Sequence, residues 1–71
     1  MDSGTELAIR AVIRGLFQTD AISRKQVQGV MSALKEAAGG AQDGRDAETA
    51  KELVALCKHI HLDTGVPPSS D

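Results

Sequence analysis

Residues 22–40, ISRKQVQGVMSALKEAAGG, contain the start signal, the apolar face and a stop signal of one amphipathic helix. Ser23 is a favourable N-cap, and Gln26 three residues later completes the S-x-x-Q form of a capping box. The apolar positions then follow the spacing of one helical face: Val27, Val30, Met31 and Leu34. Gly39 and Gly40 can adopt the left-handed conformation that ends a helix, so the pattern predicts a helix near residues 24–38.

A second helix is predicted upstream, near residues 4–18. Asp2 or Ser3 can cap its beginning. Its apolar residues are three and four apart throughout: Ile9, Val12, Ile13, Leu16 and Phe17. The short segment 18–21 that follows has the length expected between antiparallel neighbouring helices.

A third helix is predicted near residues 47–62, capped at Asp46 or Asp43 and ended at Gly65. One broad side of it is apolar, with Leu53, Leu56, Cys57 and Ile60. Before it, the Gly-rich segment 39–45 has no apolar periodicity and is the best candidate for a mobile loop.

The chain contains no alternating run of β-branched residues that would indicate a strand. We therefore expect an all-α fold, a compact three-helix bundle with short loops over residues 1–65. Residues 66–71, VPPSSD, are expected to form a disordered tail. The side chains expected to be most buried are Val12, Leu16, Val30, Leu34, Leu53 and Ile60.

The composition indicates one small domain in a reducing environment. A chain of 71 residues closes only a small core. Cys57 is the only cysteine, so no internal disulfide can stabilise that core. No apolar run approaches the roughly 20 residues of a membrane span, and the first residues lack the basic start of a signal peptide. These features favour a cytoplasmic protein with no membrane partner.

The formal net charge of −2 argues against nucleic acid as a partner, because nucleic-acid binders are usually strongly basic. With no Trp or Tyr and a single Phe, the chain also lacks the aromatic platforms of single-strand binders. Basic residues are nevertheless concentrated in the first forty positions, and the third predicted helix begins with acidic residues.

One resemblance supports an alternative function. The segment TDAISRKQVQGVMSAL, a short turn before a capped helix, is similar to the second helix of helix-turn-helix proteins. That resemblance implies a DNA-binding regulator that uses the basic side of this helix: Arg24, Lys25, Gln28 and Lys35. The opening residues also resemble histone-like proteins of the HU type, but those continue into a β-saddle where this chain has an acidic helix.

The segment from Cys57 to His61 is the only cluster with metal-ligand side chains, and Cys57 and His61, four residues apart, share a helix face as two zinc ligands can. His59 points to nearly the opposite side, so a complete zinc site would need ligands from a second chain. Packing of Cys57 in the core is the favoured interpretation. No cofactor motif or catalytic constellation is present, and we expect no enzyme activity, no catalytic residues, no cofactor and no bound metal.

The function expected from these observations is that of a small protein–protein interaction module or regulator. Its apolar stripes are wider than a three-helix core can cover, so a partner helix or a second copy is expected to bind them. The predicted contact surface is the seam between the first and third helices, with Leu7, Val54 and Leu56. A homodimer is plausible on the same grounds.

Overall fold

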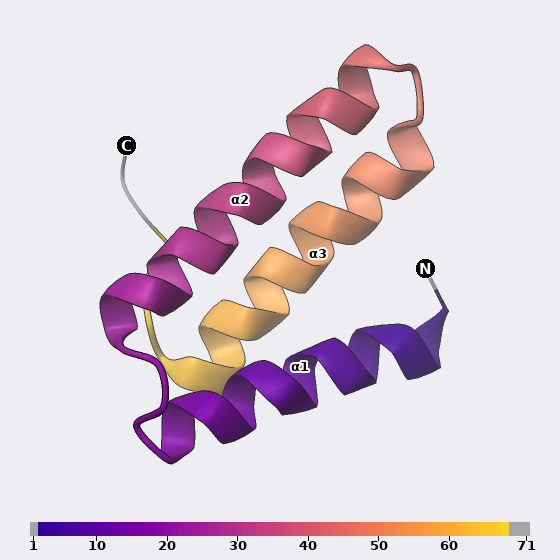
Figure 1. Cartoon of the computed structure of the whole chain (residues 1–71). Helices are drawn as coiled ribbons and strands as arrows, with labels where there is room; N and C mark the ends of the chain where they lie inside the picture. Colours follow the sequence, from indigo (N-terminus) through magenta and orange to yellow (C-terminus); the bar gives the residue numbers. More distant parts are fainter. Residues whose placement is uncertain (1, 69–71) are drawn as a thin grey trace.

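The computed structural model describes residues 2–68 and confirms the all-α, three-helix fold (Figure 1). The helices are α1 (Ser3–Gln18), α2 (Arg24–Asp43) and α3 (Ala47–Thr64). Helices α2 and α3 form a long antiparallel hairpin, and α1 crosses it near the beginning of α2 and the end of α3. None of the three helices combines the length and hydropathy that a membrane crossing requires within residues 2–68.

The helix starts agree with the capping signals in the sequence. The Ser23 hydroxyl accepts from the Gln26 amide at 3.2 Å, and the Gln26 side chain accepts from the Ser23 amide at 2.7 Å, which is the predicted capping box. Asp2 caps α1 and Asp46 caps α3, each by accepting a hydrogen bond from the backbone amide three residues later. At the other end of α3, Gly65 has a φ of 71° and donates to His61, as expected for a glycine stop.

The predicted end of the second helix at Gly39 and Gly40 is wrong. Helix α2 continues to Asp43, so most of the segment expected to be a mobile loop is helical. The reason is packing, because the buried Ala38 lies in this part of α2, and Ala50 is buried in the first turns of α3. Contact with α3 offsets the roughly 1 kcal/mol that each glycine costs inside a helix.

The core lies between α2 and α3 and is small. Its fully buried side chains are Val27, Met31, Leu56, Ile60 and Val66, with Cys57 beside them. Ile60 is thus buried as predicted, whereas Val30, Leu34 and Leu53 are only half-buried. Helix α1 contributes no fully buried residue and covers the core with half-buried side chains.

The prediction that Val12 and Leu16 are core residues is wrong, since Val12 is 60% exposed and Leu16 is also exposed. The row of α1 that faces α3 begins instead with Glu6 and Arg10, which bind α3, and continues with Ile13 and Phe17. Residues in this i, i+4, i+7, i+11 series share one side of a helix. Val12 and Leu16 are rotated away from that side.

The segment after α3 contributes to the core. Val66, which falls in the region predicted as a tail, is fully buried. His61 Nδ1 donates to the Val66 carbonyl at 2.8 Å, and the Gln28 side chain donates to the Pro67 carbonyl at 3.3 Å. These bonds hold residues 66–67 against α2 and α3. Pro68 is exposed, and the last three residues of the predicted tail, 69–71, lie outside the described residues.

The continuation of α2 through its glycines gives a test of the fold. An ideal Cβ built at Gly39 or Gly40 meets no atom within 4 Å. Replacing both with alanine should therefore stabilise the protein by roughly 0.5–1 kcal/mol per site, since alanine has the higher helix propensity. Thermal and denaturant unfolding would measure the change. A loss of stability would indicate that the helix ends at these glycines.

Candidate protein-binding face

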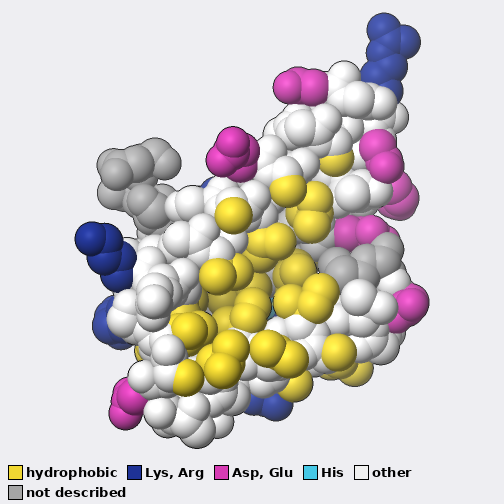
Figure 2. Space-filling view, viewed as in Figure 1, with side chains coloured by type: hydrophobic (Ala, Val, Ile, Leu, Met, Phe, Trp, Pro, Cys, Tyr) yellow, Lys and Arg dark blue, Asp and Glu magenta, His cyan; other side chains and the backbone are white. Residues whose placement is uncertain are grey.

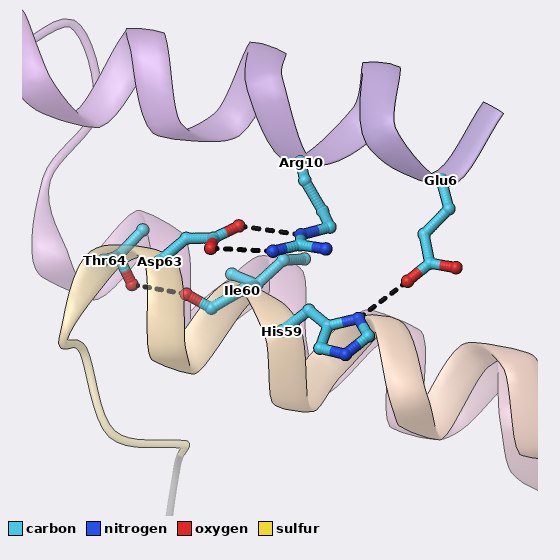
Figure 3. Close-up of polar contacts among 6 residues, drawn as sticks. All are labelled: Glu6, Arg10, His59, Ile60, Asp63 and Thr64. Carbon is cyan, nitrogen blue, oxygen red and sulfur yellow. Dashed lines mark hydrogen bonds and ion pairs between the residues drawn. The ribbon is translucent and has the colours of Figure 1, made fainter. Parts of the chain in front are cut away.

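The seam between α1 and α3, predicted to be an apolar contact surface, is polar in its exposed part (Figure 3). Arg10 forms a bidentate pair with Asp63, with N–O distances of 2.9 and 3.0 Å. One turn earlier on each helix, His59 Nδ1 lies 2.6 Å from a Glu6 carboxylate oxygen. Only one rotation of α1 about its own axis allows both pairs to form. The two pairs therefore fix which side of α1 faces outward.

The Arg10–Asp63 pair changes the acidity of its carboxyl group. The hydrogen bonds from the Arg10 guanidinium lower the pKa of Asp63, partial burial opposes this effect, and the positive charge of Arg10 adds to it. The same contacts raise the pKa of Arg10. Bidentate Arg–carboxylate pairs are directional, which suits this pair to orienting a helix.

The structure does not bring together the three predicted contact residues. Leu7 and Val54 are 58% and 56% exposed, as a contact surface requires. Val54, however, lies beside Lys35 and Gln42 of α2, on a side of α3 that α1 does not reach. The expectation that Leu56 is partly uncovered is wrong, since Leu56 is 1% exposed and is a central core residue.

A different apolar surface lies between α1 and α2, over α3. Figure 2 shows hydrophobic side chains gathered across all three helices on this face, with charged side chains at its edges. Helical spacing and the contacts described above assign seven exposed or half-buried residues to it: Ile9, Val12, Leu16, Val30, Leu34, Ala37 and Leu53. We call this surface the open apolar face.

The open apolar face exists because the core is too small to cover every stripe. In its thinnest direction the molecule measures 16 Å, roughly the thickness of two helix layers. On α1, the ion pairs of Glu6 and Arg10 set the rotation of the helix that leaves Val12 and Leu16 outside. On α2, the face consists of a row of residues without a charge, Val30, Leu34 and Ala37. None of its side chains is titratable, so it can bind apolar surface but offers no group for catalysis.

Sequence reasoning missed this face because it assigned Val12, Leu16, Val30 and Leu34 to the interior. One signal in the sequence could have identified it. Ala33 and Ala37 extend the Val30 row along α2, and both are exposed in the structure. In the sequence, this signal is an uncharged row of apolar residues that continues into small ones. Such a row indicates a helix face that another helix can approach closely.

Two of the candidate nucleic-acid residues, Gln28 and Lys35, lie on the side of α2 away from the open apolar face. Gln28 is occupied by its bond to Pro67, and Lys35 borders a hollow of about 210 Å³ between α2 and α3. Lys58 and His61 from α3 line the same hollow, so the structure adds a second lysine to the basic side. Arg24 and Lys25 are exposed at the beginning of α2 and have no ion-pair partner among residues 2–68.

Cys57 and His61 are close in the structure but make separate contacts. The Cys57 thiol is buried and lies 3.7 Å from the Met31 carbonyl oxygen, toward which it donates. His61 uses Nδ1 for the Val66 carbonyl, while His59 contacts Glu6 on the other side of α3. Within residues 2–68, no three Cys, His, Asp or Glu side chains are grouped closely enough to hold a metal.

The lowered pKa of Asp63 predicts that acid loosens α1. A carboxyl group with a depressed pKa in the folded state stabilises that state above the unfolded pKa, and this contribution disappears as pH falls through the folded value. Asp63→Asn should therefore lower the melting temperature at neutral pH. The difference from the wild type should shrink below about pH 4, near the ordinary Asp pKa.

The measurement is a series of thermal melts of both proteins from neutral to acidic pH. Asp2 and Asp46 also have lowered pKa values, because each accepts hydrogen bonds from the residue three positions on, and both remain in the variant. Their contributions therefore cancel in the comparison. A difference that is absent at neutral pH, or unchanged in acid, would contradict the assigned role of Asp63.

No protein-family model, curated protein or solved structure matches this chain, so its function has to be inferred from its own surfaces.

Proposed function

We propose that this chain is a small non-enzymatic protein-binding module whose binding site is the open apolar face. The single observation that carries the proposal is a continuous, uncharged apolar surface over three helices of a domain with a small core. Exposed apolar patches of this kind usually mark contact sites on soluble domains. Binding and not catalysis is proposed because the face has no titratable side chain.

The shape of the face supports an apolar helix as the bound element. Helices α1 and α2 form its two sides, with Val12 and Leu16 along one and Ala37 along the other. Half-buried Leu53 of α3 lies between them. An amphipathic helix placed there would contact side chains at the spacing that helix-in-groove recognition uses.

Site-specific photo-crosslinking tests the proposal. The photoreactive residue p-benzoyl-phenylalanine would replace Ala37, which is exposed on the face, in cells that naturally produce the chain. The matched control carries the same residue at Leu62, which is exposed on the opposite side of α3 from Leu53. Irradiation should give an adduct of defined mass at position 37 and none at position 62.

An adduct at position 37 with any protein chain supports the proposal, and mass spectrometry identifies its partner. Equal labelling at both positions, or no adduct at position 37, would contradict it. Circular dichroism of both variants should match the wild type, which establishes that the fold is retained.

DNA binding is the second candidate, favoured by the convergence of Lys35 and Lys58 on one side of α2 and α3. If it is correct, duplex DNA should bind with an affinity that falls steeply as salt rises from about 50 to 200 mM. Arg24→Ala with Lys25→Ala should then weaken binding. We expect no measurable binding at physiological salt, because the net charge is −2. Fluorescence anisotropy with a labelled duplex would decide.

A further inference from the structure

We infer that the occupant of the open apolar face is a second copy of this chain, bound in a two-fold symmetric dimer. The inference rests on the proposed function, since it names the partner of the same face. A two-fold contact places the same patch of both copies together. The patch contains no charge, so its burial against itself leaves no ion without water or a partner.

Charges at the edges of the face complement one another under this symmetry. Figure 2 shows acidic side chains gathered at the edge where α1 and α3 begin, and basic side chains at the opposite edge, where α2 begins with Arg24 and Lys25 (Figures 1 and 2). A two-fold axis in the contact plane, running across α1, places the basic edge of each copy opposite the acidic edge of the other. The complementarity occurs twice.

The same axis determines which helices meet. It makes the two α1 helices antiparallel, so that Val12 and Leu16 of one copy lie against those of the other. These are the most exposed large side chains of the face. Leu7 is also exposed on α1, but it lies about 140° around the helix from Val12 and remains outside the contact.

This difference provides a matched pair of variants, Val12→Asp and Leu7→Asp. Sedimentation equilibrium of the full chain, from micromolar to millimolar concentration, should show a dimer for the wild type and for Leu7→Asp. Val12→Asp should weaken dimerisation more than about tenfold, because symmetry places the new carboxylate in the apolar contact twice. Both variants should retain wild-type helicity, since neither residue is in the core.

Disulfide formation reports the symmetry directly. Val12→Cys should form an intermolecular disulfide on mild oxidation, since residues beside a two-fold axis meet their own copies. Leu7→Cys should stay reduced under the same conditions. Cys57 is buried and is present in both variants.

Arg24→Glu with Lys25→Glu should weaken the dimer several-fold at low salt and less at high salt.

A wild-type chain that remains monomeric at millimolar concentration would overturn the inference. So would equal effects of Val12→Asp and Leu7→Asp, or equal disulfide formation at the two positions. If the chain is monomeric while Ala37 crosslinks to a different protein, the proposed function stands and the dimer fails. If position 37 crosslinks to nothing, both fail.

Discussion

The rotation of α1 about its own axis is the constraint on which the surface of this protein depends. A helix with apolar residues at Ile9, Val12, Ile13, Leu16 and Phe17 has several orientations that bury similar areas. The Glu6–His59 and Arg10–Asp63 pairs select one of them. Such partly exposed pairs add little to the overall free energy of folding. Their effect is directional, since they decide which apolar side chains cover the core and which remain outside.

Local signals in the sequence predict the elements well and their packing poorly. The three caps at Asp2, Ser23 and Asp46 depend on residues three positions apart, so the sequence alone contains them. Gly65 is a similar case. The continuation of α2 through Gly39 and Gly40 depends instead on the packing of α2 against α3, where Ala38 and Ala50 are buried. Helix propensity carries no information about that contact.

The candidate site shows the same division. Periodicity identifies Val12 and Leu56 equally as apolar-face residues, yet one is 60% exposed and the other 1%. Val12 is exposed because two side-chain pairs between segments more than fifty residues apart set the rotation of α1, whereas Leu56 is buried in the core that α2 and α3 form. The sequence predicted surplus apolar surface and a protein partner, but it placed that surface on the α1–α3 seam. No sequence pattern indicates that Glu6 pairs with His59 or that Arg10 pairs with Asp63 on this seam.

Cys57 gives the chain an internal reporter of its own opening. Its thiol lies under α2, directed toward the Met31 carbonyl, and is shielded in the closed fold. Cys57 is 6% exposed beside the hollow between α2 and α3, so separation of these helices should speed its reaction with a thiol reagent. Because this is the only cysteine, every modified molecule records the same event. The modification rate of Cys57 therefore reports how often the α2–α3 hairpin opens.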